Sequence, residues 1–518
     1  MKNYSKKIVS IAVIIAMLIS LVSMTGCSEE ELWAYLEMFE YVSGSDAPYY
    51  GYDEEVPDED EDIVDDIEDE EEDTDDEEEP ALDGKFRKHY TKIKGNGKDV
   101  ATVMIYMCGS NLESDNGFAS ADIKEMLKAD YSEDVNILIE TGGTRKWNAQ
   151  KLTDDGSNIS TKKNQCWQVM EDDITLVGET SGREPMTDPD TLLDFINFCT
   201  KNYPANRYML ILWDHGDGAV GGFGYDEFYT SETLTIDGVQ SALKESGVKF
   251  DFVGYDACLM GMIEVAYTMY DYVDYFIASE DYEPAYGWEY EGWLNALSED
   301  TSISTEELGE IIIKDYVKEC GRQDGILSLF DLVYVEYVFD KWCDFAYENE
   351  ETLLSTDYAW ETESSDRFTD KEKFNWTDLF YYSDESHIID LLAVASTIES
   401  DKSEDLMNAL NAMIVCSYST SSTAYSASYM TGLSVALPYG DSYLYESIKE
   451  IYPNCGFDDE YVEFLGKFVE SESAPNNDEI WGEWGDIWSG WESWEDLLDY
   501  EWGEWGSIND YLDEWLEW

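Results

Sequence analysis

Histidine is scarce in this chain, and one of the three histidines stands where a catalytic base is expected. His215 follows the apolar run Tyr208–Trp213 and precedes Gly216, in the sequence Trp-Asp-His-Gly-Asp-Gly. An unbroken apolar run is typical of a buried parallel strand, and catalytic groups collect at the carboxyl ends of such strands. We therefore interpret His215 as a candidate base, His387 as structural and His89 as a surface residue.

A cysteine occupies the corresponding place after the next predicted strand. Cys258 follows Phe250–Tyr255, and a helical pattern over Met260–Tyr272 comes directly afterwards. This order predicts a thiol at or near a helix N-terminus, where thiol pKa is lowered and amides are available for an oxyanion. If the two strands are neighbours, Cys258 and His215 emerge at one edge as nucleophile and base. The residues alone also permit a buried cysteine beside an incidental histidine.

Other catalytic and metal-binding signatures are missing from the sequence. It contains no HExxH, no Walker loop, no GxGxxG after a strand and no GxSxG elbow. The eight cysteines beyond Cys27 are scattered and form no CxxC pair, which argues against a zinc knuckle and against a disulfide scaffold. We expect most of them to be small buried residues.

Composition limits the classes of partner. The 518 residues include 31 basic and 116 acidic ones, for a formal net charge of −85, and 43% are hydrophobic. The apolar content is ample for a packed core. The charge excludes nucleic acid as a partner and disfavours anionic lipid headgroups. It favours cationic ligands, basic peptides or divalent ions.

The two ends of the chain differ from its body. Residues 1–27 are predicted to be a lipoprotein-type export signal, because early lysines precede the apolar run Ile8–Val22 and a Gly-Cys junction follows it. Cys27 would be the lipidated residue at this junction. The alternatives are an ordinary cleaved signal and a retained anchor. Residues 28–84 form an acidic spacer without the apolar content to fold. Residues 471–518 form an acidic tail rich in tryptophan, interpreted as a docked helix, a binding stripe or, less readily, a membrane-surface segment.

Strand and helix patterns alternate from about residue 85, which predicts an α/β fold around a mostly parallel sheet. The second half is predicted to contain helices over 304–320 and 385–416 and an extended segment over Ser426–Leu437, in an α+β arrangement. The expected strands of the first half are Thr102–Met107, Val135–Glu140, Tyr208–Trp213, Phe250–Tyr255 and Tyr275–Ser279, and the other expected helices are Ala119–Lys128, Asp188–Tyr203, Ile236–Ser246 and Met260–Tyr272.

An ordered set of motifs resembles the clostripain family of cysteine endopeptidases. The set comprises the strand ending Cys108–Leu112 (CGSNL), the pair His215-Gly216, the segment Asp256–Gly261 (DACLMG) and the segment Ala278–Tyr290. The resemblance covers residues 98–300 well and extends less closely to about 470. It implies a caspase-like α/β/α sandwich and hydrolysis of peptide bonds.

The resemblance also implies roles for individual residues. His215 matches the catalytic histidine, Cys258 matches the nucleophile that forms a thioester, and the amides of Gly216 and Cys258 match the oxyanion hole. Asp256 matches the acid that receives a basic P1 side chain; its alternative role is to cap the following helix. No cofactor is implied as a requirement. Some relatives need calcium, and the histidine loop holds carboxylates of the type that calcium prefers: Asp214, Asp217, Asp226 and Glu227.

Two departures from the family pattern affect specificity and activation. Relatives commonly have Pro-Gly-Asp-Gly-Trp where this chain has Pro-Ala-Tyr-Gly-Trp, so that Tyr286 replaces a second pocket acid. Glu280, Asp281 and Glu283 are candidates to compensate. Residues 216–243 contain no Lys or Arg at which relatives often cleave themselves, which predicts a single-chain enzyme or one that is activated elsewhere.

The leading hypothesis is an exported cysteine endopeptidase, anchored to the membrane by lipid and acting on proteins or peptides after Arg or Lys. The main alternative is a non-catalytic surface protein that uses a caspase-like scaffold and binds through its tryptophan-rich tail. A third hypothesis keeps Cys258 and His215 but assigns them to a narrow-specificity processing peptidase or a transpeptidase.

Overall fold

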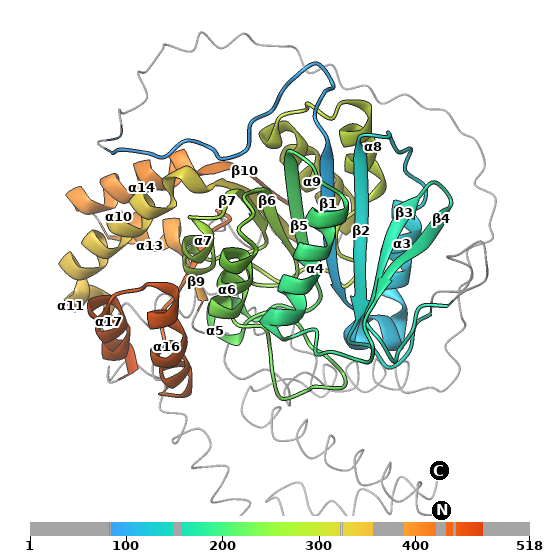
Figure 1. Ribbon diagram of the computed structural model, residues 1–518. Helices are drawn as coiled ribbons and strands as arrows, with labels where there is room; N and C mark the ends of the chain where they lie inside the picture. The colour runs from blue at the N-terminus through green and yellow to red at the C-terminus, as the bar shows by residue number, and fades with distance from the viewer. Residues whose placement is uncertain are drawn as a thin grey trace, which may run out of the picture. The chain divides into compact units, whose positions relative to one another are not determined.

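A large mixed sheet runs through the molecule (Figure 1). The computed structural model describes residues 82, 84–148, 158–321, 323, 325–355, 388–398, 400–420, 431–438 and 442–469. The strands lie in the spatial order β10 (Ile414–Ser419), β8 (Ile326–Asp331), β7 (Val273–Ala278), β6 (Phe250–Asp256), β5 (Arg207–Trp213), β1 (Ala101–Cys108), β2 (Val135–Gly142), β3 (Gln165–Met170) and β4 (Asp173–Glu179).

The centre of the sheet is parallel and its two flanks are antiparallel. Strands β7, β6, β5, β1 and β2 pair in parallel, whereas β8 and β10 on one side and β3 and β4 on the other are antiparallel. Every residue of β1, β6 and β7 is buried, as expected for strands that are covered on both faces. The predicted α/β class and mostly parallel sheet are confirmed.

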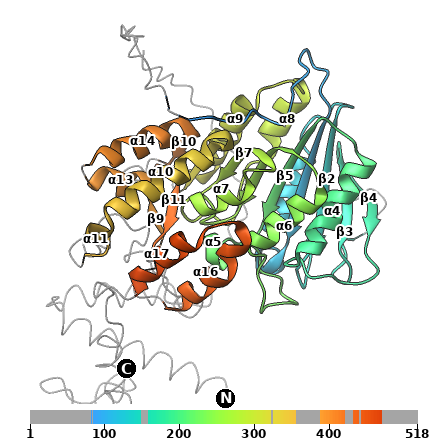
Figure 2. The ribbon, with the colours of Figure 1, turned by 60° about the vertical axis from the view of Figure 1, so that its left-hand side comes forward.

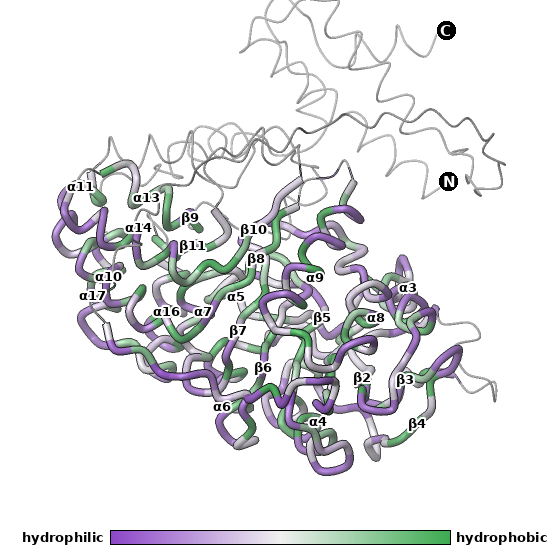
Figure 3. The backbone as a smooth tube through the Cα atoms, turned by 90° about the horizontal axis from the view of Figure 1, so that it is seen from above, coloured by the Kyte–Doolittle hydropathy of each residue, from purple (hydrophilic) through white to green (hydrophobic). Residues whose placement is uncertain are grey.

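Helices cover both faces of the sheet (Figures 1 and 2). Two hydrophobic clusters fill the space between helices and sheet, one on each face. In the first cluster, residues of α4 (Pro189–Asn202), α6 (Ile236–Ser246) and α7 (Ile263–Met269) pack against one face of the sheet. In the second cluster, residues of α3 (Phe118–Met126), α8 (Glu291–Glu299) and α9 (Thr305–Cys320) pack against the other face. Colouring by hydropathy shows mainly apolar strands between helices with polar stretches (Figure 3).

Local sequence explains where two of these helices begin and end. Helix α4 starts with Asp188 as N-cap, whose side chain accepts a hydrogen bond from the Asp190 amide, and with Pro189 in its first turn. Helix α6 has the predicted bounds and ends at Gly247, whose φ of 65° is the left-handed conformation that glycine adopts readily. These signals are local, which is why the sequence could reveal them.

The second half of the chain differs from the prediction of one helical stretch over 385–416. Residues 414–419 form β10, which pairs with β8 at the edge of the main sheet, and a small two-stranded sheet joins β9 (Ile388–Asp390) to β11 (Ser434–Ala436). The apolar residues of 414–419 complete a distant sheet rather than continue a helix. The helices of this half are α10 (Val335–Glu348), α11 (Glu350–Leu353), α13 (Leu391–Thr397), α14 (Asp401–Met413), α16 (Ser442–Cys455) and α17 (Asp459–Val469).

Several predictions fall on residues that the structure does not describe. These are the signal segment 1–27 with Cys27, nearly all of the acidic spacer 28–84, His387, residues 426–430 of the predicted extended segment Ser426–Leu437 and the tail 471–518. The described part of that extended segment contains strand β11, as predicted. Among the helices of the described residues, none combines the length and the apolar character needed to cross a bilayer.

His89 is half-buried, which corrects its interpretation as a surface residue: its Nε2 lies 3.0 Å from Asp331 Oδ1, and its ring stacks on Tyr275. The hydrogen bond to Asp331 raises the pKa of His89.

All eight cysteines beyond Cys27 are free thiols and five of them are buried, as predicted.

Candidate active site

The candidate base and nucleophile leave neighbouring strands at the same edge of the sheet. Strands β5 and β6 are parallel neighbours, with Trp213 opposite Asp256 in register, and the Asp214 amide donates to the Asp256 carbonyl over 3.3 Å. His215 and Cys258 each follow within two residues of these strand ends. Strand β1 pairs with β2 on one side and with β5 on the other, so the chain order reverses beside this site. Ligand sites of open α/β sheets lie at such switch points.

The loops after β5 and β6 are in close contact. A Cβ atom built on Gly216 would lie 2.2 Å from the carbonyl oxygen of Cys258 and 3.2 Å from Cβ of Ala257. Only glycine therefore fits between His215 and the cysteine loop. Within the described part of the chain, neither the Gly216 amide nor the Cys258 amide donates a hydrogen bond to another residue. Both donors are thus available to a bound oxygen atom.

His215 is held by an asparagine that the sequence analysis did not single out. His215 Nε2 lies 2.8 Å from Oδ1 of Asn111, which follows β1 by three residues. The imidazole also lies steeply inclined to the Tyr225 ring, with an interplanar angle of 74° and centroids 6.3 Å apart. Asn111 stands in the Cys108–Leu112 motif, after the strand end at the switch point, and this position was the available signal for it. Asn111 can fix the orientation of the imidazole.

Cys258 lies in a loop, so its predicted place at a helix N-terminus is wrong. Helix α7 begins only at Ile263, because the intervening residues bond to another segment. Leu259, with φ of 61°, donates from its amide to the Asp281 carbonyl, and the Gly261 amide donates to the Ser279 carbonyl. The Cys258 Sγ atom accepts a hydrogen bond from the Glu283 amide over 3.2 Å. Burial raises the pKa of the thiol to about 12, the opposite of the predicted direction.

Asp256 is a buried carboxyl that faces the segment after β7. Its oxygens accept hydrogen bonds from the Trp288 amide at 3.2 and 3.3 Å and from the Tyr290 hydroxyl at 2.8 Å. Burial raises its pKa to about 7. The alternative role as a helix cap is contradicted, because the N-cap of α7 is Met262 and no side chain caps that end. Asp256 therefore joins the end of β6 to segment 288–290, two residues before the nucleophile.

Comparison with known proteins decides the family. A family model described as the clostripain family matches residues 105–500. The chain belongs to the clostripain family. The clostripain-family chain is 27% identical over 419 residues to the clostripain of Hathewaya histolytica, a match that covers 68% of this chain and 77% of that protein.

A solved structure agrees with the fold of this clostripain-family chain. It is a secreted C11 cysteine protease from Bacteroides thetaiotaomicron in complex with an irreversible peptide inhibitor, 18% identical, with a TM-score of 0.52 over 70% of this chain and all of that one. The likeness supports the caspase-like α/β arrangement. The family membership makes the protein a cysteine endopeptidase and disfavours the non-catalytic alternative.

The raised pKa of Cys258 in this clostripain-family site leads to a test by alkylation. Because the pKa of the Cys258 thiol is about 12, the fraction of thiolate is expected to rise about tenfold per pH unit across neutrality. The rate of alkylation by iodoacetamide is expected to rise by the same factor, since the thiolate is the reacting species. The rate is measured by mass spectrometry of the Cys258 peptide between pH 6 and 9. A plateau already reached at pH 6–7 would contradict the prediction, since it indicates a thiolate paired with the His215 imidazolium.

Tyr286, which replaces the second acid of the clostripain pocket, is engaged elsewhere. Its hydroxyl donates to the Cys320 carbonyl at the end of α9, over 3.1 Å. Of the three acids predicted as substitutes, Glu280 accepts a hydrogen bond from the Gly432 amide, and the backbone of Asp281 holds Leu259. The carboxyl of Glu283 lies against that of Asp256, whose charge, after burial, raises the pKa of Glu283 most strongly.

The four carboxylates considered for calcium do not form one ligand set. Within the described residues, no three acidic, cysteine or histidine side chains are arranged to hold a metal ion. The four acids make separate local contacts. The Asp214 carboxylate accepts a hydrogen bond from the Tyr225 amide, and the Asp226 carboxylate accepts hydrogen bonds from the Met186 and Phe228 amides. The Glu227 carboxylate accepts a hydrogen bond from the Arg145 amide, and Asp217 is the N-cap residue of the short helix α5 (Gly218–Gly221).

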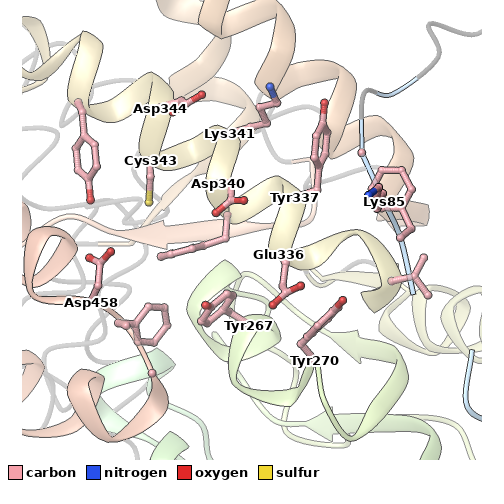
Figure 4. A pocket seen from close by; sticks show the side chains of 17 residues that line it. Lys85, Tyr267, Tyr270, Glu336, Tyr337, Asp340, Lys341, Cys343, Asp344 and Asp458 are labelled. Atoms are coloured by element: carbon pink, nitrogen blue, oxygen red, sulfur yellow. The ribbon is translucent and has the colours of Figure 1, made fainter. Parts of the chain in front are cut away.

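A separate cavity of about 590 Å³ lies among α7, α10 and residues 456–458 (Figure 4). Tyrosines and acids line it, among them Tyr267, Tyr270, Glu336, Asp340 and Asp458. None of the predicted site residues takes part, so this cavity is distinct from the site at the ends of β5 and β6.

Proposed function

We propose that this endopeptidase cleaves peptide bonds after Arg or Lys, with Cys258 as nucleophile, His215 as base and Asp256 as the acid that receives the P1 side chain. The observation that carries the proposal is the position of Asp256, a buried carboxyl two residues before Cys258. A carboxylate removed from water favours a cationic partner strongly, and a guanidinium or ammonium group supplies one.

The reaction uses groups that lie at one sheet edge. His215 takes the proton of the Cys258 thiol as Sγ attacks the scissile carbonyl carbon, and the amides of Gly216 and Cys258 donate to the developing oxyanion. The C–N bond then breaks, and the proton passes from His215 to the leaving amine. Water, deprotonated by His215, cleaves the thioester and releases the acyl product with the free thiol. The two unengaged amides and the Asn111–His215 hydrogen bond support these roles.

Export and anchoring belong to the same proposal. Residues 1–27 serve as a lipoprotein-type signal with Cys27 as the lipidated residue, 28–84 as an acidic spacer, 85–470 as the peptidase domain and 471–518 as a tail. The similar Bacteroides protease is described as secreted, which supports export. The lipid would hold the enzyme at the cell membrane, where its substrates are proteins or peptides with basic residues.

The proposal is tested with fluorogenic peptides that differ only at P1, as Arg, Lys, Asn, Asp or Leu. We expect kcat/KM for Arg or Lys to exceed that for Leu by at least about 100-fold, because the buried acid is left without its counter-charge by a neutral side chain. Parallel assays with calcium and with EDTA measure any metal requirement. A preference for Asn, Asp or Leu would refute the assigned specificity.

The active enzyme also serves to test the prediction that the protein remains a single chain. Residues 216–243 contain no Lys or Arg, so active enzyme is expected to remain uncut within this interval. N-terminal sequencing of fully active protein checks this, and a new N-terminus within that interval would contradict it.

A further inference from the structure

We propose that Glu283 is a second specificity-determining residue of the P1 pocket and that it binds the basic side chain together with Asp256. The inference rests on the proposed preference for Arg or Lys, and it assigns to Glu283 the part that an acid at position 286 has in relatives.

The first observation is a buried carboxyl with no opposite charge beside it. Both side-chain oxygens of Glu283 are buried, and the groups next to them are the Asp256 carboxyl, the Ala257 amide and the Trp288 indole, none of which is a cation. Buried charges in native proteins are almost always paired with an opposite charge, so two adjoining buried acids call for a ligand or a function. An acid in this condition is a site prepared for a cation, because a guanidinium or ammonium group supplies both the charge and the hydrogen-bond donors.

The second observation is where this carboxyl lies. The Glu283 amide donates to Cys258 Sγ over 3.2 Å, which fixes residue 283 beside the nucleophile. The Glu283 side chain lies against Asp256, and burial followed by the Asp256 charge raises the pKa of Glu283. Asp256 is itself fixed by the Trp288 amide and the Tyr290 hydroxyl. Two buried acids thus adjoin each other, and the backbone of one of them is bonded to the reacting sulfur.

The third observation is that the other nearby candidates point elsewhere. Tyr286 donates its hydroxyl to the Cys320 carbonyl, so position 286 is directed towards α9. The Glu280 carboxyl accepts from the Gly432 amide and adjoins Asp390, which belongs to β9. Glu283 is the acid of this segment that shares a site with Asp256.

The test compares two peptides that are identical except for arginine or citrulline at P1, since citrulline keeps the shape and lacks the charge. The full chain is assayed as wild type and as Glu283→Gln, Glu283→Asp, Asp256→Asn and Glu319→Gln. We expect Glu283→Gln to lower the arginine-to-citrulline ratio of kcat/KM by about 10- to 100-fold. Glu283→Asp, which keeps the charge, is expected to retain more of the ratio than Glu283→Gln.

Glu319→Gln is the matched control. Glu319 is exposed at the end of α9 and is near enough for its charge to raise the pKa of Tyr286 and Cys320, so this variant removes one negative charge close to the pocket but outside it. We expect it to leave the ratio unchanged. Thermal unfolding of every variant confirms that the fold is intact.

The outcomes separate the two proposals. In one outcome the wild type discriminates arginine from citrulline, Asp256→Asn loses this discrimination and Glu283→Gln keeps it. This outcome would refute the role of Glu283 and leave the proposed specificity in place. If the wild type does not discriminate at all, the proposed specificity fails and the role of Glu283 fails with it. An equal loss in Glu283→Gln and Glu319→Gln would assign the effect to general charge and would also refute the inference.

Discussion

Replacement of Cys258 by alanine is expected to lower kcat/KM for a cleavable peptide by at least about 10⁴-fold. The acyl group is carried on Sγ, and alanine offers no atom that could form the thioester; only binding and oxyanion stabilisation would remain. The loss is measured with the best P1 peptide, together with the unfolding temperature, which we expect to change little because the variant removes a single half-buried atom.

Cys416→Ala is the matched control for this variant. Cys416 is also a half-buried free thiol, but it lies on β10 at the edge strand of the sheet, so full activity is expected. If Cys258→Ala retained more than about one hundredth of the activity, Cys258 could not be the nucleophile.

The second large effect is expected from Gly216→Ala. The added Cβ would lie 2.2 Å from the Cys258 carbonyl oxygen, so the His215 loop and the cysteine loop must move apart. Misplacement of catalytic groups by about 1 Å costs about 100-fold in rate, and we expect a fall in kcat of that size. Overpacking of this kind costs about 1–3 kcal/mol in the free energy of unfolding, which chemical denaturation measures.

Gly182→Ala is the control for the glycine substitution. A Cβ on Gly182 would meet no atom within 4 Å, and its backbone is not in the left-handed region, so both activity and stability are expected to stay at the wild-type level. Wild-type activity of Gly216→Ala would show that the two loops are not held together as tightly as the catalytic proposal requires.

The sequence was most informative where local signals and the sheet edge coincide. The apolar runs of β5 and β6 predicted two buried parallel strands, and their adjacency brings the His215 and Cys258 loops to one edge. The bounds of α6 were predicted without error because Gly247 marks its end. The hairpin β3–β4 was not predicted, since β4 is largely exposed and lacks a long apolar run.

The errors concern residues whose conformation depends on distant partners. The loop after Cys258 has helix-forming composition, yet its amides bond to 279–281 and helix α7 is delayed to Ile263. The contact between Asn111 and His215 joins residues 104 positions apart, which no local pattern reveals. The pKa of Cys258 follows burial, which depends on the packing of the whole site.

The hydrogen bonds between the cysteine loop and β11 set the order in which the enzyme can mature. The Ser434 hydroxyl and amide both donate to the Gly261 carbonyl, across 173 residues of chain. At about 5–20 residues per second, a ribosome needs at least several seconds to supply that strand after Gly261 has been made. A nascent chain therefore carries Cys258 and His215 well before the strand that holds the loop after Cys258 has been made. Synthesis itself is therefore expected to delay the appearance of proteolytic activity, and a fragment that ends before Ser434 is expected to lack activity because β11 is not there to hold the loop after Cys258.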